Sequence, residues 1–129
     1  MKLLIVGSRS IVDFDLSPYI PTDVDTVICG DAGRVDRLAE QYADLHRLSK
    51  YILRPQYARY KRAAPLKRNE QMVALADAVL VIWDGRSKGT QRVLKYAEKT
   101  GKPTTLVFAA AASQKFSSPA LLSDKKLLQ

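Results

Sequence analysis

The stretch that decides the fold is RNEQMVALADAVLVIWDGRSKGT, residues 68–90. Its run from Ala78 to Trp83 is continuously apolar and rich in β-branched residues, which is typical of a strand covered on both faces. Apolar residues at helical spacings of three and four precede that run: Met72, Val73, Leu75 and Ala76. Small and charged residues follow it from Asp84 to Thr90, where a second helix begins. The stretch therefore predicts a helix–strand–loop–helix unit.

The loop between Asp84 and Thr90 predicts an anion-binding site. Open α/β sheets bind ligands where a parallel strand ends and the next helix starts, because free backbone N–H groups and the helix dipole favour an anion there. Two glycines let this backbone turn tightly, and Ser87 and Thr90 offer hydroxyls that cap a helix or bond a phosphate. Arg68 could close the site from the other side. The working hypothesis is a phosphate-bearing ligand.

Strands and helices alternate along the rest of the chain. Further strands are expected over Lys2–Val6, Val24–Cys29, Lys50–Leu53 and Pro103–Phe108, and further helices over Leu16–Ile20, Val35–Leu45 and Thr90–Lys99, the last ending at Gly101. Such alternation requires crossover connections, and hence a parallel sheet with helices on both faces. The predicted fold class is α/β, a Rossmann-like three-layer domain with strand order 3-2-1-4-5. Residues 1–110 are expected to form it.

Residues 111–129 are expected to form a C-terminal tail that is partly ordered, or that packs on the domain or on a neighbouring subunit. From Ala109 onward the sequence changes to alanines, then polar residues, then leucine pairs. A homodimer is a further expectation, although no periodicity identifies its interface.

Three glycine-containing loops meet at one edge of a sheet with this strand order: Gly7–Ser10, Gly30–Gly33 and Gly85–Thr90. Their convergence predicts a single site, although none of them carries the dinucleotide fingerprint or a Walker sequence. The candidate ligand-binding residues are Gly7, Ser8, Arg9, Gly30, Asp31, Ala32, Gly33, Asp36, Arg68, Asn69, Asp84, Gly85, Ser87, Lys88, Gly89 and Thr90. Arg68 is also the candidate catalytic residue.

Several of these residues have a structural alternative. Gly7–Ser10 taken alone reads as an ordinary turn with a solvated arginine. Asp31 and Asp36, near the start of a helix, suit the helix dipole, a role in stability that needs no ligand. Trp83, beside the candidate loop, belongs either to the core or to a surface on which a base stacks.

The composition describes an ordinary globular chain with an excess of positive charge. It has 47% hydrophobic and 26% charged residues, a formal net charge of +8 and a pI of about 9.7. The excess favours polyanionic partners, namely nucleic acid, nucleotides or an acidic protein. No apolar run approaches the ~18–20 residues of a membrane span, so no membrane association is expected. The N-terminus reads as a first strand and not as a signal peptide.

Cysteine and histidine usage point to a cytoplasmic protein without a metal. The single Cys29 excludes an intrachain disulfide, fits a reducing cytosol and is expected to be buried. His46 is the only histidine and is expected at a helix end. No Cys or Asp cluster has metal-ligand spacing, so neither a metal nor another cofactor is expected.

The segment from Arg54 to Arg68 is strongly basic. It holds six lysines and arginines and no acid, interleaved with Tyr57 and Tyr60. Basic residues among aromatics can grip phosphates and stack bases. They can equally form a solvated face with amphipathic tyrosines. Both interpretations stand at this point.

A set of short motifs, taken in order, resembles the SLOG superfamily of Rossmann-like domains, and most closely its small YspA-like members. The resemblance covers the chain from Gly7 to about Phe108 and implies a nucleotide-derived ligand at the convergent loops. The motifs are Gly7–Arg9, Gly30–Asp36, Pro55–Tyr60 leading into Ala64-Pro65, Arg68-Asn69 with Met72, Ala76–Ala78, Trp83–Gly85, Ser87-x-Gly89-Thr90 and Gly101–Pro103.

The LOG phosphoribohydrolases, which cleave the N-glycosidic bond of nucleoside monophosphates, are more distant relatives in this resemblance. Their Arg-Lys-x-x-Met motif matches Arg68 and Met72, with Asn69 in place of the lysine. Their Gly-Thr-x-x-Glu motif matches Gly89-Thr90, but the catalytic glutamate position holds Val93. The loss of that carboxylate argues against the activity. The substitutes that the chain offers are Asp36, Glu70 and Asp84.

The DprA family, which binds single-stranded DNA, shares the Gly-Ser-Arg loop, the Gly-x-Asp helix entry and the Arg-Asn pair. Three functions are therefore weighed. The leading one is a module that binds a nucleotide or nucleotide sugar, as a sensor or by sequestering it. The second is a nucleotide N-glycosidic hydrolase or transferase, and the third is single-stranded nucleic-acid binding.

Overall fold

The structure is a computed structural model that describes residues 1–109. Its centre is a sheet of five parallel strands in the order β3-β2-β1-β4-β5. The predicted α/β class and the predicted order are therefore confirmed. The strands are β1 (Lys2–Gly7), β2 (Thr26–Cys29), β3 (Ser49–Ile52), β4 (Ala78–Trp83) and β5 (Thr104–Phe108).

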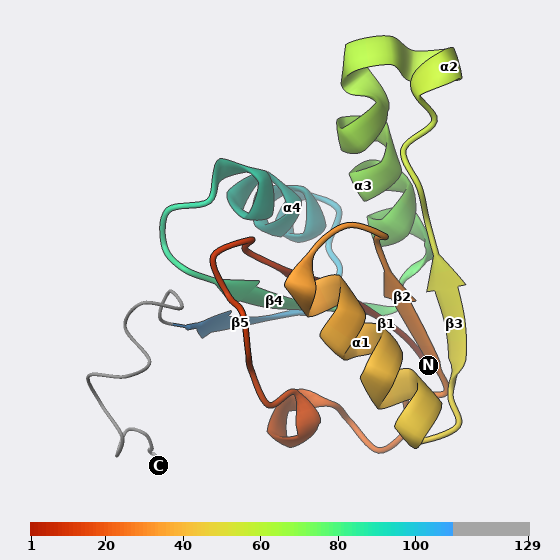
Figure 1. Ribbon diagram of the computed structural model, residues 1–129, viewed down its shortest axis with the longest axis vertical. Helices are drawn as coiled ribbons and strands as arrows, with labels where there is room; N and C mark the ends of the chain where they lie inside the picture. Colours follow the sequence, from red (N-terminus) through yellow and green to blue (C-terminus); the bar gives the residue numbers. More distant parts are fainter. Residues whose placement is uncertain (110–129) are drawn as a thin grey trace.

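Helices cover both faces of this sheet, which explains why β1 and β4 are continuously apolar (Figure 1). Helix α1 (Arg34–Leu45) packs on one face, against Leu3 and Ile5 of β1. Helices α3 (Ala64–Leu75) and α4 (Lys88–Lys99) pack on the other, against Leu4 and Val6. Alternate residues of each central strand thus enter separate cores, as the two-residue repeat of a strand requires.

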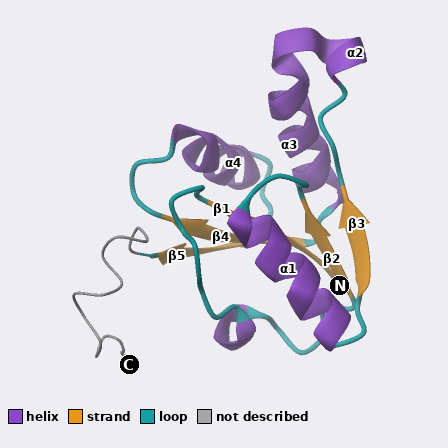
Figure 2. Cartoon of the chain, viewed as in Figure 1, coloured by secondary structure: helices purple, strands orange, loops and turns teal. Residues whose placement is uncertain are grey.

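The segment that follows β3 projects beyond the sheet. It holds the short helix α2 (Tyr57–Tyr60), a 3₁₀ helix over Lys61–Ala63 and the start of α3 (Figures 1 and 2). Helix α2 is absent from the predicted elements, because a four-residue helix is too short to display a hydrophobic period. The expected helix near Leu16–Ile20 is a single 3₁₀ turn, Ser17–Tyr19, with a proline in its first turn.

Several boundaries differ from the prediction by one or two residues. Helix α4 begins at Lys88 instead of Thr90, because the hydroxyl of Ser87 caps it by accepting a 3.3 Å hydrogen bond from the Thr90 N–H group. Gly101 follows the end of α4 with a φ of +78°, which confirms the predicted helix stop. His46 is the C-terminal cap of α1, as expected. The predicted tail, 111–129, lies outside the described residues.

No helix within residues 1–109 is both long and apolar enough to cross a membrane.

Candidate functional site

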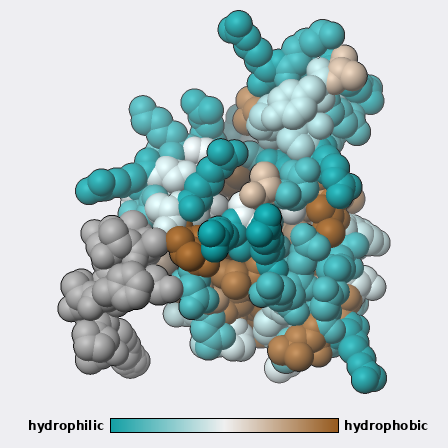
Figure 3. Space-filling model, viewed as in Figure 1, coloured by the Kyte–Doolittle hydropathy of each residue, from teal (hydrophilic) through white to brown (hydrophobic). Residues whose placement is uncertain are grey.

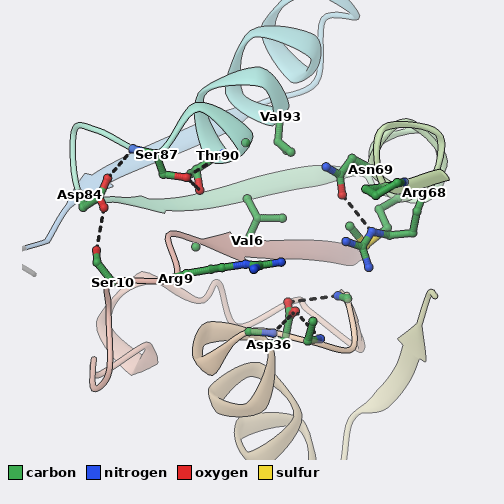
Figure 4. Close-up of a pocket in the computed structure, with 17 residues that line it drawn as sticks. Val6, Arg9, Ser10, Asp36, Arg68, Asn69, Asp84, Ser87, Thr90 and Val93 are labelled. Carbon is green, nitrogen blue, oxygen red and sulfur yellow. Dashed lines mark hydrogen bonds between the residues drawn. The ribbon is translucent and has the colours of Figure 1, made fainter. Parts of the chain in front are cut away.

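A cavity of about 420 Å³ lies at the carboxyl edge of the sheet, where the loops after β1, β2 and β4 meet the side of α3 (Figure 4). Its volume is in the range of small-molecule sites, and its place is the usual ligand position in open α/β sheets. Twelve of the sixteen candidate residues line it: Gly7, Arg9, Gly30, Ala32, Gly33, Asp36, Arg68, Asn69, Asp84, Ser87, Gly89 and Thr90. The convergence of the three loops that the strand order implies is present in the structure.

The other four candidates do not line the cavity. Ser8 is buried, and its hydroxyl donates to Thr90 Oγ1 at 3.3 Å and accepts from the Asp84 N–H group at 3.1 Å. Asp31 contacts Arg68, and Lys88 is the exposed first residue of α4. Gly85 has a φ of +83°, a backbone conformation that favours glycine, so it serves the turn. The Ser8 hydroxyl therefore joins two loops of the protein, and the expectation that Ser8 contacts a ligand stays a prediction.

Five lining residues are absent from the candidate set. They are Val6, Ser10, Pro65, Met72 and Val93. Ser10 belongs to the predicted loop after β1, so its place in that loop could have identified it as a lining residue. Val6, Met72 and Val93 belong to the apolar faces of β1, α3 and α4, and they give the cavity an apolar part. The sequence signal that could have identified them is their place in the apolar pattern of a strand or helix, at the point where that element reaches the edge of the sheet.

Asp36, in the first turn of α1, closes the N-terminus of its own helix. Its carboxylate accepts hydrogen bonds from the N–H groups of Gly30, Ala32 and Gly33, at 3.1, 3.2 and 3.0 Å (Figure 4). Asp36 thus uses N–H groups of the loop that precedes α1 and places a carboxylate beside the start of this helix, where it repels an anion. The loop after β2 is therefore an unfavourable place for a phosphate.

Asp84, at the end of β4, organises the loop before α4. It accepts hydrogen bonds from the Ser10 hydroxyl at 2.7 Å and from the N–H groups of Arg86 and Ser87, each at 2.8 Å. The bond from Ser10, together with those two N–H bonds, lowers the pKa of the Asp84 carboxyl from 3.8 to about 2, although partial burial opposes the shift. Asp84 is therefore ionised at neutral pH and is a poor general acid.

Two backbone donors at the start of α4 have no partner in the part of the chain that the structure describes. The Thr90 N–H group is capped by Ser87, but the N–H groups of Lys88 and Gly89 donate to no acceptor among the described residues. A Cβ placed on Gly89 would meet nothing within 4 Å, so the space beside it is open. Free N–H groups at the positive end of a twelve-residue helix attract an anion.

Arg68 reaches the cavity from α3 with an anchored guanidinium. Its Nε donates to Asn69 Oδ1 at 2.9 Å, and its Nη1 donates to the Leu53 carbonyl at 3.2 Å and contacts Asp31 at 3.5 Å. Only 14% of the side chain is exposed. Its Nη2 makes no hydrogen bond within the described part of the chain. A Cβ on Gly30 would lie 2.8 Å from Nη1, so this glycine makes room for the arginine.

Arg9 lines the cavity from the loop after β1, and its guanidinium, unlike that of Arg68, is not anchored by residues 1–109. It is exposed, and it has neither a hydrogen bond nor an ion pair from its side chain within residues 1–109. Figure 4 shows its side chain extending across the cavity between Val6 and Asp36. An arginine in this position presents all five of its N–H donors to a ligand.

Both lining carboxylates already accept hydrogen bonds from the protein. Asp36 and Asp84 are occupied by backbone N–H groups, as described above. Glu70 does not line the cavity and contacts Lys67 at 3.8 Å. Val93 lines it at the position where the LOG enzymes carry their glutamate. At that position the described site therefore holds an apolar side chain and no carboxylate.

Trp83 belongs to the core. Its indole N–H donates to the Ser87 carbonyl at 2.9 Å, and its ring packs against Phe108 with centroids 5.6 Å apart. It does not line the cavity, so of the two interpretations the structural one holds. Among residues 1–109, no group of three or more His, Cys, Asp or Glu side chains is placed to hold a metal ion.

Fold and cavity together define a Rossmann-like α/β domain with an open site at the carboxyl edge of its sheet. No family model and no solved structure matches the chain. The chain is similar to an uncharacterised SPbeta prophage-derived protein, YoqJ, of Bacillus subtilis (strain 168), with 31% identity over 68 residues. The match covers 52% of this chain and 40% of that relative, so the chain spans well under two thirds of the relative's length.

Proposed function

We propose that the protein binds a phosphate-bearing, nucleotide-derived ligand in the carboxyl-edge cavity, as a sensor or sequestering domain of the SLOG type. The proposal rests on which polar groups of the site already have a hydrogen-bond partner in the protein and which do not. Its two carboxylates are consumed by the protein's own backbone, and the groups left over are donors. A cavity with spare donors and no spare carboxylate suits an anion.

The phosphate belongs at the start of α4. The unpartnered N–H groups of Lys88 and Gly89 lie there, and the space beside Gly89 is open. Arg9 extends into the same cavity and supplies a full positive charge (Figure 4). Backbone donors, helix dipole and guanidinium act together in many phosphate sites.

The remainder of the ligand lies toward α3. Val6, Met72 and Val93 offer an apolar surface for a sugar or base, and Asn69 and the free Nη2 of Arg68 offer donors for a ribose oxygen or a second charged group. The Oδ1 atom of Asn69 is held by Arg68, so its amide nitrogen is the group free to donate. A nucleotide and a nucleotide sugar both present this combination of phosphate, hydroxyls and a less polar ring.

Binding is favoured over hydrolysis because no lining carboxylate is free. The proposal therefore includes the absence of turnover, and a cytoplasmic location, where nucleotides are abundant. Release of free base from nucleoside monophosphates, lost in Arg68→Ala, would overturn this part of the proposal.

The test is a thermal-shift series with nucleoside mono- and diphosphates, ADP-ribose and NAD. A ligand at about a hundred times its dissociation constant stabilises the fold by roughly 2.7 kcal/mol, which is on the order of 10 °C for a domain of this size. Arg9→Ala and Arg68→Ala should each abolish most of that shift. Arg37→Ala, an exposed arginine on α1 away from the cavity, is the matched control and should keep it.

A second readout comes from Trp83, the only tryptophan of the chain, which is hydrogen-bonded to the cap residue of α4. Phosphate bound at the start of α4 should change the fluorescence of Trp83, and this change should depend on ligand concentration in the same way as the thermal shift does. The proposal fails if no phosphate-bearing compound shifts the melting temperature, or if the shift survives in both cavity variants.

A further inference from the structure

A second cationic feature begins beside the cavity and extends away from it; only its residues Pro65 and Arg68 line the cavity. We call residues 54–68, with α2 and the start of α3, the basic hairpin. It holds six of the chain's 21 lysines and arginines and none of its 13 acids. The rest of the chain, with fifteen cations against thirteen acids, has a net charge of +2. Most of the +8 excess is therefore concentrated in one segment.

Three of the six cations have no acidic partner within residues 1–109. Arg68 belongs to the cavity, Arg54 contacts Asp31 at 3.6 Å and Lys67 contacts Glu70 at 3.8 Å. Those that remain are Arg59, Lys61 and Arg62, which are exposed and form no ion pair within residues 1–109. We call these three residues the hairpin cations. These three like charges repel one another in the free protein, and binding of an anionic partner removes that repulsion.

Two tyrosines stand beside the hairpin cations. The side chain of Tyr57 is 60% exposed, and the Arg59 guanidinium lies 5.2 Å from the centroid of the half-buried Tyr60 ring. An exposed planar ring next to uncompensated cations is the combination with which proteins stack bases while they neutralise the phosphates between them.

The backbone holds this arrangement away from the body of the domain. Lys61 adopts φ +55° and ψ −126°, a conformation rarely taken by residues other than glycine, and there α2 ends and the 3₁₀ helix begins. Figure 1 shows α2 and the start of α3 projecting beyond the sheet, and the projecting end is predominantly hydrophilic in Figure 3. The hairpin cations and Tyr57 therefore share one exposed end of the molecule.

We propose that the basic hairpin binds single-stranded nucleic acid, with Arg59, Lys61 and Arg62 on the phosphates and Tyr57 stacked on a base. A single strand of nucleic acid is favoured over a lipid surface because interfacial segments bury a continuous apolar face, whereas α2 offers only two tyrosines and one alanine beside Arg59. The surface is separate from the cavity, since none of the hairpin cations lines it.

The experiment measures the fluorescence anisotropy of a labelled oligothymidylate of about 20 nucleotides, long enough for a typical single-strand site. Three neutralised phosphates imply a slope of about −2 in log affinity against log salt, or roughly 20-fold weaker binding at 200 mM than at 50 mM salt. The variant R59Q/K61Q/R62Q should bind at least ~10-fold more weakly at low salt and lose about 2 from the slope. Tyr57→Ala should lose roughly 5- to 100-fold, and Tyr57→Phe should retain binding.

The matched control is R37Q/K95Q/K99Q, which removes the same charge from exposed residues of α1 and α4. It should keep the affinity, and if it loses as much as the hairpin variant, the effect is one of net charge and the proposal is wrong. Anisotropy that does not respond to the oligonucleotide, or binding only to anionic phospholipid vesicles, also overturns it. Arg9→Ala should keep oligonucleotide binding, and the hairpin variant should keep any nucleotide thermal shift, so the two proposals fail separately.

Discussion

The Ser10 hydroxyl donates a 2.7 Å hydrogen bond to Asp84, and so joins the loop after β1 to the loop after β4, 74 residues away along the chain. The same carboxylate accepts the N–H groups of Arg86 and Ser87, and Ser87 caps α4. One aspartate thus holds together the two loops that flank the proposed phosphate position. Its effect on stability and on binding should be separable by pH.

Asp84→Asn should destabilise the protein at pH 7 and have little effect near pH 2. The pKa of the Asp84 carboxyl is lowered from 3.8 to about 2 in the folded protein. Its charge therefore stabilises the fold above pH ~4, and this contribution is lost as the pH falls toward 2. After allowance for solvent screening the loss at pH 7 is about 1 kcal/mol. Urea unfolding between pH 2 and 7 measures the difference in free energy of unfolding between Asp84→Asn and the parent protein, with the exposed Asp23→Asn as control. A difference that stays constant down to pH 2 would contradict the stabilising role of the Asp84 charge.

A second prediction concerns two glycines with opposite surroundings. A Cβ on Gly7 would lie 2.3 Å from Val35 Cγ2, whereas a Cβ on Gly89 would meet nothing within 4 Å. Gly7→Ala should therefore cost about 1–3 kcal/mol through overpacking of α1 against β1. Gly89→Ala, in the first turn of α4, should be neutral or stabilise by up to ~1 kcal/mol. Chemical denaturation of both variants tests the pair.

The double variant Gly7→Ala, Val35→Ala separates the clash from other effects. If the clash between the new Cβ at position 7 and the Val35 side chain is the cause, the two substitutions together should cost less than the sum of their separate effects, because Val35→Ala removes the atoms that the new Cβ would meet. Additive losses would mean that Gly7 matters for another reason.

The sheet and the three convergent loops were predictable because they rest on periodicity and on chain order. Continuous apolar runs identified the buried strands, and the alternation of elements left few topologies. Ten of the twelve candidate residues that line the cavity follow from that order, since parallel strands bring their carboxyl ends, and the loops and helix starts after them, to one edge. Arg68 and Asn69 lie on α3 and do not follow from strand order.

The hydrogen-bond partners of the polar residues were not predictable in the same way. Ser8 follows a strand whose residues alternate between two cores, and only the three-dimensional path after Gly7 turns its hydroxyl inward to Thr90. Asp36 was expected near the helix dipole, but its bonds to three N–H groups depend on how the loop after β2 folds back. A residue type indicates what a side chain can donate or accept, and tertiary structure decides whether that capacity is already used.

Cys29 should be unreactive in the folded protein. It is fully buried at the end of β2, which confirms the sequence expectation, and burial, with a smaller contribution from Asp36, raises the pKa of its thiol to about 12. The thiolate, which is the reactive form, is therefore almost absent at pH 8. Alkylation with iodoacetamide, followed by mass spectrometry, should be negligible in buffer and complete in denaturant. Rapid labelling without denaturant would show that β2 opens locally.

Lys61→Gly should stabilise the fold while it weakens oligonucleotide binding. Relief of a strained non-glycine conformation offers ~1–3 kcal/mol, against ~0.5–1 kcal/mol for the greater freedom of glycine in the unfolded chain, so the net gain is about 1 kcal/mol. Arg47→Gly, at the other described non-glycine residue with a positive φ, is the control for the backbone effect and should leave binding unchanged. Lys61→Gln keeps the strain and removes the charge, so it should weaken binding as Lys61→Gly does, without the gain in melting temperature. A Lys61→Gly variant that is less stable than the parent would mean that the Lys61 side chain contributes more to the hairpin than its backbone costs, and the strain argument would then be wrong.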